Sequence, residues 1–192
     1  MQIDYAAIDP NTRYKLMSQT VTPRPIAWIV TEDEGVVNIA PFSYFAPLSS
    51  EPPVVVVSIG HKKDGSPKDT LANILATKKC TICTVSKEHL VKMHITGSEL
   101  EKVVSEAEKF DIPTVREAEG YPPMIEGADA ALFCDFYQTV DLPGSRTIPV
   151  VLEVKSQFVK EGLSDEKLGF VLKNIGRVGW AYHHTDDELT RL

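Results

Sequence analysis

The side chains best suited to bind an anion lie in one short loop. Within seven residues the loop carries three lysines, Lys62, Lys63 and Lys68. Its second half predicts a helix start, with Ser66 as the N-cap, Pro67 at the first helical position and Asp69 closing an acidic variant of the capping box. Free backbone N–H groups and the helix dipole attract anions at such a start. Ser66 and Thr70 add hydroxyl donors, so the loop indicates a phosphate site.

A second reading of the same loop stays open. Surface loops often carry lysines, and a solvated basic loop beside a capped helix explains the residues equally well. Asp69 argues mildly against phosphate, because a carboxylate in the first helical turn competes for the same N–H groups.

A second polar group lies upstream, in the stretch from Asn38 to Ser43. Pro41 cannot donate to a strand ladder, so regular pairing is predicted to break there and to free neighbouring backbone N–H groups. Those groups, with the Asn38 and Ser43 side chains, would suit the polar edge of a planar heterocycle. A β-bulge with buried aromatic residues is the alternative interpretation.

Predicted strands flank both the lysine-rich loop and the stretch from Asn38 to Ser43, and would position them. The pattern predicts a strand over Ile26–Thr31, a turn ending at Gly35 and a returning strand over Val36–Ala40. Phe42–Ser50 is predicted to be irregular, with its aromatic residues turned inward. The continuous apolar run Val54–Ile59 indicates a strand covered on both faces.

The rest of the chain is predicted to complete a barrel. Further strands are expected over Cys80–Ser86, Ala130–Val140 and Ile148–Lys160, and short helical segments over Arg13–Met17, Ser98–Phe110 and Asp165–Val171. Helices do not alternate with strands one for one, which disfavours a doubly wound parallel sheet. A mainly β, closed antiparallel barrel with short helices at its ends fits better, as a single domain over residues 1–192.

Composition excludes several classes of function. The net charge of −7 disfavours nonspecific nucleic-acid binding, and no apolar run approaches the roughly 20 residues of a membrane helix. The N-terminus has no signal-peptide pattern, which predicts a cytoplasmic protein.

Cysteine and histidine spacing favours packing and surface roles over metal binding. Cys80 and Cys83 stand three apart on a strand and face opposite sides, and Cys134 lies in an apolar strand. The spacing of His89 and His94 and the adjacency of His183 and His184 do not predict a shared site on one element. A cluster assembled across the fold remains an alternative, and we predict no metal site.

Several motifs together resemble the flavoredoxin branch of the flavin-reductase-like proteins. They are Pro23-Arg24-Pro25-Ile26-Ala27-Trp28, Asn38 to Ser43, Pro52-Pro53, Lys68-Asp69-Thr70-Leu71-Ala72-Asn73-Ile74 and the late Arg177-Val178-Gly179 with Tyr182. The resemblance covers most of residues 20–182 and is faint from about 87 to 125. Trp180 stands where the family pattern has a second glycine.

The resemblance implies an FMN-binding split β-barrel of antiparallel, Greek-key type, usually a homodimer with the flavin at or near the subunit interface. Carried over by motif, the ring would be lined by residues 38 and 40–43, and the phosphate and ribityl end by Ser66, Lys68, Asp69 and Thr70. Arg24 would neutralise phosphate or brace the dimer, and Ser49 and Ser58 are further expected contacts. The full set of predicted cofactor-binding residues is Arg24, Asn38, Ala40, Pro41, Phe42, Ser43, Ser49, Ser58, Ser66, Lys68, Asp69 and Thr70.

The resemblance further implies an oxidoreductase that moves electrons from NAD(P)H through FMN to a flavin, ferric or protein acceptor. Backbone N–H groups around Ala40 to Ser43 would stabilise the negative charge that hydride transfer leaves on the flavin, and no side chain is predicted as catalytic acid or base. A flavoredoxin-type carrier fed by a protein donor is the second hypothesis, in which Trp180 shields one flavin face. A split-barrel binder of heme or a deazaflavin is the third.

Overall fold

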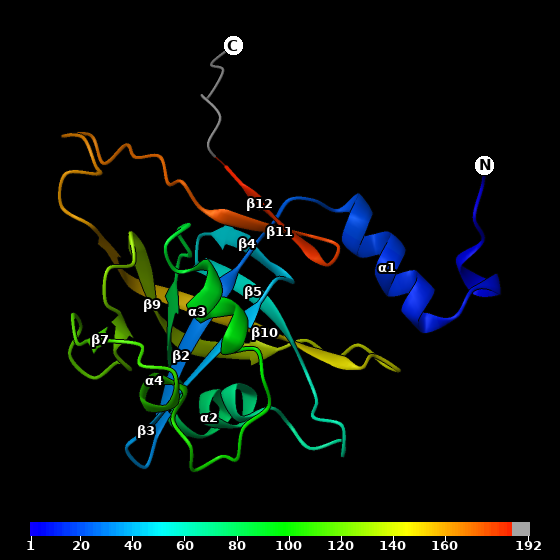
Figure 1. Cartoon of the computed structure of the whole chain (residues 1–192), viewed down its shortest axis with the longest axis horizontal. Helices are drawn as coiled ribbons and strands as arrows, with labels where there is room; N and C mark the ends of the chain where they lie inside the picture. Colours follow the sequence, from blue (N-terminus) through cyan, green and yellow to red (C-terminus); the bar gives the residue numbers. More distant parts are fainter. Residues whose placement is uncertain (186–192) are drawn as a thin grey trace.

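A computed structural model describes residues 1–185 of the chain, and its main feature is one seven-stranded antiparallel sheet (Figure 1). The strand order is β3-β2-β6-β9-β10-β5-β4. The strands are β2 (Ala27–Asp33), β3 (Val36–Phe42), β4 (Phe45–Ser50), β5 (Pro53–Gly60), β6 (Lys79–Cys83), β9 (Ala130–Thr139) and β10 (Thr147–Val159). The mainly β prediction is confirmed, but the ladder leaves β3 and β4 as edges, so the prediction of a closed barrel is wrong.

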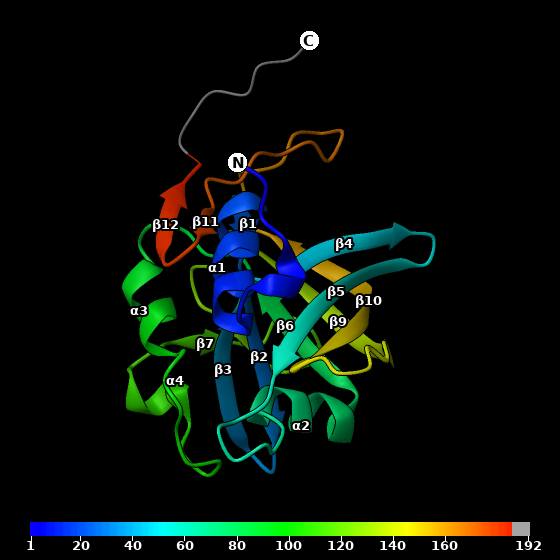
Figure 2. The same cartoon turned by 90° about the vertical axis from the view of Figure 1, so that its right-hand side faces the viewer.

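Smaller elements surround this sheet. The helices are η1 (Tyr5–Ala7), α1 (Pro10–Thr20), α2 (Asp69–Thr77), α3 (Leu90–Ile95) and α4 (Glu106–Lys109). A second sheet joins β1 (Arg24–Pro25), β11 (Ile175–Val178) and β12 (Ala181–His184), and a two-stranded ladder joins β7 (Thr114–Val115) and β8 (Met124–Ile125). Figure 2 shows α1 beside the second sheet, with the β4–β5 ribbon projecting from the body.

The sheet is buried on both faces because its strands carry apolar residues at successive positions. Along β2, Trp28 and Val30 enter one core cluster, while Ala27 and Ile29 enter the other. Side chains alternate across a strand, so an unbroken apolar run fills both faces. Leu71 and Ile74 of α2 cover the second cluster, which places the start of α2 beside β3.

The cysteines follow the same alternation. Cys80 and Cys134 are direct cross-strand partners in one core cluster, whereas Cys83 lies in the other. All three are free and buried, and burial raises the pKa of the Cys83 thiol to about 12. The prediction of structural packing is confirmed.

Pro41 does not interrupt the sheet, contrary to expectation. Strand β3 continues to Phe42, and Pro41 is paired in register with Trp28. The register makes this a non-hydrogen-bonded pair, so the missing N–H of Pro41 would face away from β2 at a free edge. The expected irregular stretch Phe42–Ser50 is likewise wrong, because Phe45–Ser50 forms β4.

Three helix predictions need correction. Helix α2 begins at Asp69, not after Ser66, because the Ser66 amide and hydroxyl both bond to the Asp64 carboxylate. The predicted helix from Ser98 to Phe110 is only the four-residue α4, capped by Ser105. The segment 165–171 contains turns and no helix.

Candidate functional site

The candidate site is a groove along the free edge of β3, formed by two adjoining cavities. The larger has a volume of about 360 Å³ and the smaller about 70 Å³. They share four lining residues, Pro41, Phe42, Gly97 and Ser98. One wall is therefore β3 and the other is the chain that follows α3.

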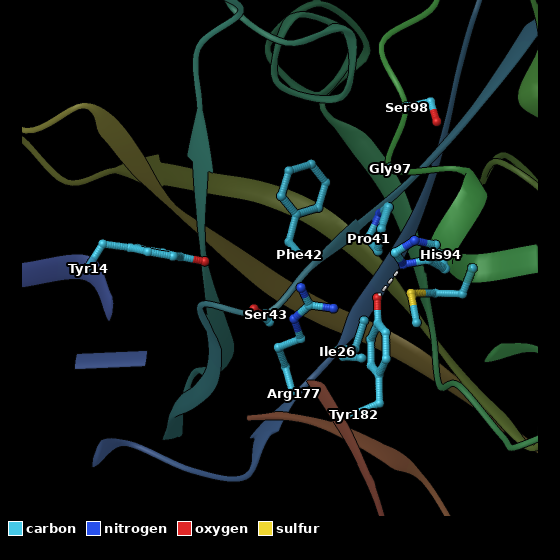
Figure 3. Close-up of a pocket in the computed structure, with 11 residues that line it drawn as sticks. Tyr14, Ile26, Pro41, Phe42, Ser43, His94, Gly97, Ser98, Arg177 and Tyr182 are labelled. Carbon is cyan, nitrogen blue, oxygen red and sulfur yellow. Dashed lines mark hydrogen bonds between the residues drawn. The ribbon is translucent and has the colours of Figure 1, made fainter. Parts of the chain in front are cut away.

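The larger cavity, here called the ring end, collects side chains from five parts of the chain (Figure 3). Its lining is Tyr14, Ile26, Pro41, Phe42, Ser43, Met93, His94, Gly97, Ser98, Arg177 and Tyr182. The Tyr182 hydroxyl lies 2.8 Å from His94 Nδ1, which links β12 to α3 across the cavity. The Arg177 guanidinium lies 4.4 Å from the centroid of the Tyr182 ring.

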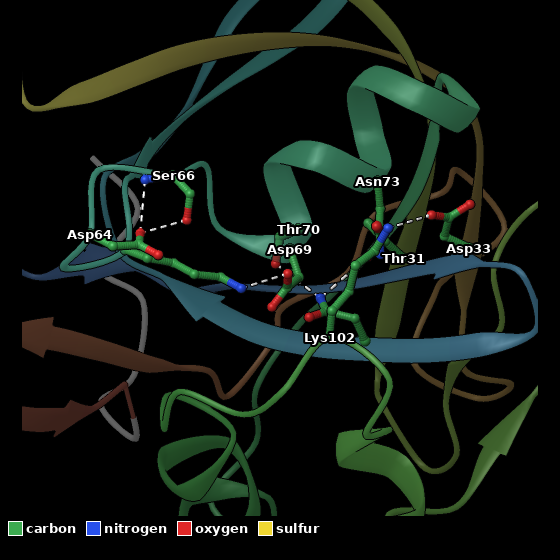
Figure 4. Close-up of polar contacts among 10 residues, drawn as sticks. Thr31, Asp33, Asp64, Ser66, Asp69, Thr70, Asn73 and Lys102 are labelled. Carbon is green, nitrogen blue, oxygen red and sulfur yellow. Dashed lines mark hydrogen bonds and ion pairs between the residues drawn. The ribbon is translucent and has the colours of Figure 1, made fainter.

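The smaller cavity, here called the helix end, lies at the start of α2 (Figure 4). The N-cap residue Lys68 makes no side-chain hydrogen bond to the first turn of α2, so that turn keeps its N–H groups uncapped by any side chain. Asp69 does not cap the helix, since it accepts a 2.8 Å ion pair from Lys62. The positive helix terminus and Lys68 therefore remain to attract an anion.

Asn38 joins the helix end to the sheet. Its amide nitrogen donates to Thr31 Oγ1 at 3.2 Å and to Thr70 Oγ1 at 3.0 Å, and all three residues are buried. This network fixes the side chains of Asn38 and Thr70 where the groove meets α2.

The backbone of β3 presents fewer donors to the groove than we expected. In the β2–β3 register the N–H groups of Ala40 and Phe42 face β2, and Pro41 has none. Only Ser43, just beyond the strand, retains an N–H that the ladder does not use. The expectation of several backbone donors between Ala40 and Ser43 is therefore wrong.

Eight of the predicted contact residues line the groove, namely Asn38, Ala40, Pro41, Phe42, Ser43, Lys68, Asp69 and Thr70. The other four do not. Arg24 and Ser58 line a separate apolar cavity beside α1, Ser49 bonds the Glu51 amide in the exposed β4 ribbon, and Ser66 bonds Asp64. Arg24 is buried, and its guanidinium donates to the carbonyls of Ser18 and Val21 at the end of α1.

Sequence reasoning missed part of the groove. Tyr14, Met93 and Ser98 come from segments with no local motif, and only the tertiary fold brings them together. Arg177 and Tyr182 belong to the late motif, which by itself predicts no place for them in the site. Trp180 lies outside the groove lining, 74% exposed, and packs 5.9 Å from the ring of Tyr14.

The histidine side chains have separate partners and positions. His94 bonds Tyr182, His89 Nδ1 lies 3.1 Å from Ser86 Oγ, and β12 carries His183 and His184. Within residues 1–185, no group of three or more His, Cys, Asp or Glu side chains has the arrangement of a metal site.

Glu106 secures the outer edge of β3. Its carboxylate accepts the Ile39 N–H at 2.9 Å, and the neighbouring Ser105 hydroxyl donates to the Val37 carbonyl at 2.7 Å. Glu106 is only 6% exposed, and burial, with a further contribution from the charge of Asp69, raises the pKa of its carboxyl. The start of α4 thus replaces the missing neighbour strand along the groove.

Substitutions of Glu106 are expected to separate its hydrogen bond from its charge. Glu106→Ala leaves the buried Ile39 N–H without its partner and should lower the free energy of unfolding by about 1–3 kcal/mol. Glu106→Gln keeps an acceptor. Because the folded-state pKa is raised, the contribution of Glu106 to stability is fully present below the usual pKa near 4.5 and is lost as pH rises through the raised value. The stability of Glu106→Gln relative to wild type should therefore increase from pH 4 to pH 7 in urea unfolding at fixed protein concentration; a constant difference would contradict the assignment.

Comparison with known proteins assigns the family. The model of the flavin reductase like domain matches residues 17–179. The chain belongs to the flavin-reductase-like family. The resemblance seen in the motifs and the split-barrel fold are thereby confirmed, and membership supports flavin binding. Of the curated relatives, an uncharacterized protein of Aquifex aeolicus is 34% identical over 91% of this chain and 90% of its own.

Solved structures of other proteins have the same fold as this chain. The 2-nitrobenzoate 2-nitroreductase of Pseudomonas fluorescens superposes with a TM-score of 0.89 at 28% identity, covering 100% of this chain and 95% of that one. An FMN-binding protein of Thermus thermophilus has a TM-score of 0.81 at 22% identity, with full coverage of both chains. At this level of identity, the similarity to the FMN-binding protein shows a shared fold.

Within residues 1–185, no helix has the length and apolarity needed to cross a membrane.

The hydrogen-bond donors and the apolar side chains of the groove suit a flavin. At the helix end, an uncapped helix start beside Lys68 suits a phosphate. At the ring end, aromatic and apolar side chains including Phe42, Ile26 and Met93 suit a flat ring, with Ser43 as a polar donor.

Proposed function

We propose that this protein is an FMN-dependent oxidoreductase of a single domain over residues 1–192, which moves electrons from NAD(P)H through FMN to a flavin, ferric or protein acceptor. We further propose that it acts in the cytoplasm as a homodimer. The observation that carries the proposal is the continuous groove, with an anion-attracting helix start at one end and a cavity of mixed aromatic, apolar and polar lining at the other.

The size of the helix end favours FMN over FAD. That cavity holds about 70 Å³ and is bounded by Lys62, Asp69 and Glu106. A single phosphate is compatible with such a space, whereas the additional AMP of FAD would extend beyond it.

The bound FMN would supply the hydride and electron chemistry, and the chain's own residues would hold and orient it. Lys68 and the first turn of α2 would hold the phosphate. Thr70 and Asn38, linked by their hydrogen bond, would lie beside the ribityl chain, with Asp69 and its partner Lys62 close by. Pro41, Phe42 and Ser43 would line the ring.

The position of Trp180 favours an enzyme over a carrier. A carrier without a nucleotide site requires a cover over the flavin, and Trp180 was the candidate for that cover. Its side chain instead lies outside the groove lining, with its ring 5.9 Å from that of Tyr14, and is mostly exposed. In the single chain Trp180 therefore does not line the ring end, where a nicotinamide would approach the flavin.

We expect the purified protein to be yellow and to release FMN on heating. Anaerobic NADH or NADPH should bleach the flavin absorbance within seconds, since the ring end is open. Bleaching only by dithionite or a reduced protein donor would instead establish the carrier. A colourless protein that takes up no FMN would contradict the proposal and leave heme or a deazaflavin as the ligands to test.

A further inference from the structure

The ring end is a cationic cavity in an acidic protein. The net charge is −7, yet none of the eleven residues that line this cavity is Asp or Glu, and Arg177 contributes a full positive charge. A cleft lined by one sign of charge concentrates ligands of the opposite sign. The helix end differs, because three carboxylates, Asp69, Glu99 and Glu106, line it.

Within residues 1–185, Arg177 is held in place without an ion-pair partner. Its Nε donates to the Gly179 carbonyl at 3.1 Å, and its guanidinium stacks near the Tyr182 ring. Among residues 1–185, no ion pair includes Arg177, and no hydrogen bond uses its terminal nitrogens. Figure 3 shows the guanidinium pointing into the cavity, with the hydroxyls of Ser43 and Tyr14 also directed inward.

A second arginine, Arg24, adds positive charge beside Arg177. Arg24 is the direct cross-strand partner of Arg177 in the β1–β11 pair. Like charges directly opposite each other destabilise a strand pair. The Arg24 guanidinium is satisfied only in part by the described residues, since its Nη1 bonds the end of α1 while its buried Nε and Nη2 have no partner among residues 1–185. An anion bound at Arg177 would offset this repulsion.

We propose that the ring end binds an organic carboxylate with a planar, apolar body, and that Arg177 is its carboxylate ligand. The planar guanidinium fork matches a carboxylate through two parallel hydrogen bonds. Tyr182 and Ile26 provide apolar walls for a flat body beside Arg177, and the Tyr14 hydroxyl is an additional donor. The inference rests on the proposed function and concerns a ligand of the same site, in which the carboxylate anchors the molecule at Arg177 and takes no part in electron transfer.

The test compares benzoate with benzamide, its neutral isostere. Each is titrated into FMN-loaded protein at constant ionic strength, and binding is measured by calorimetry and by the perturbation of the flavin absorbance. Benzoate should bind more tightly than benzamide. Arg177→Gln should weaken benzoate binding by roughly 10- to 100-fold, the loss expected for a charge-assisted bond, and leave benzamide binding unaltered. Arg177→Lys should retain part of the preference, since it keeps the charge without the fork.

Control experiments distinguish carboxylate binding by Arg177 from cofactor binding and from general attraction of anions. Arg146→Gln, on the exposed tip between β9 and β10, should leave benzoate binding unaltered. Equal binding of benzoate and benzamide, or competition by inorganic phosphate as strong as that by benzoate, would overturn the proposal. Loss of FMN affinity in Arg177→Gln with an unaltered benzoate preference would also overturn it, because Arg177 would then serve the cofactor. Failure of the wild-type protein to take up FMN would count against the proposed function instead.

Discussion

Replacement of Lys68 by alanine is expected to weaken FMN binding by roughly 10- to 100-fold, which corresponds to the loss of one charge-assisted hydrogen bond of about 1.5–3 kcal/mol. Lys68 lines the helix end, at the N-cap of α2. The neighbouring Lys62 cannot fully substitute, since it already pairs with Asp69. The measurement is the dissociation constant from quenching of FMN fluorescence.

Two comparisons make this prediction specific for the phosphate. Riboflavin lacks the phosphate, so its affinity should be the same in wild type and Lys68→Ala. Lys63→Ala removes an exposed lysine of the same loop that does not line the groove, and it should have little effect. Equal losses in Lys63→Ala and Lys68→Ala would indicate general attraction by the loop and refute a defined phosphate site.

Thr70 is a less direct probe than its sequence position suggests. It is buried and accepts the hydrogen bond from Asn38, so Thr70→Ala also disturbs the Asn38 side chain. The double variant Lys68→Ala/Thr70→Ala should bind FMN more weakly than Lys68→Ala alone, but the additional loss reports on both side chains. The single lysine variant is therefore the cleaner test.

Trp28→Ala is expected to lower the free energy of unfolding by about 3–5 kcal/mol. Trp28 is 0% exposed near the start of β2, and its Nε1 donates to Thr96 Oγ1 at 3.0 Å. The Thr96 hydroxyl in turn donates to the Met93 carbonyl at 2.8 Å, which ties the chain after α3 to the sheet. Loss of the indole would leave a cavity and release one wall of the groove.

Urea unfolding of the flavin-free protein, followed by circular dichroism, measures this effect. Trp28→Phe keeps most of the volume and loses the hydrogen bond, so its destabilisation should be smaller, about 1–3 kcal/mol. Trp180→Ala is the matched control, because that indole is 74% exposed and its removal should change stability by about 0.5 kcal/mol or less. A Trp28→Ala variant as stable as Trp180→Ala would contradict the described packing.

The strands were predictable because their signal is local. The runs Ile26–Thr31, Val54–Ile59, Ala130–Val140 and Ile148–Lys160 correspond closely to β2, β5, β9 and β10. The helix predictions failed where one side chain had two available partners. Ser66 fits an N-cap, but Asp64 stands two residues before it and accepts both its amide and its hydroxyl, which moves the helix start to Asp69.

Local patterns and short motifs were enough to predict the mainly β class, the family and eight of the residues that line the groove. Tertiary structure alone decided which groups face the groove. The β2–β3 register turns the Ala40 and Phe42 N–H groups away, and long-range packing brings Glu106 to Ile39 and His94 to Tyr182. The loop that is predicted to bind an anion contains an uncapped helix start beside Lys68, and Asp69 pairs with Lys62. Hydrogen-bond direction and charge pairing depend on neighbours distant in the chain, and no local motif specifies them.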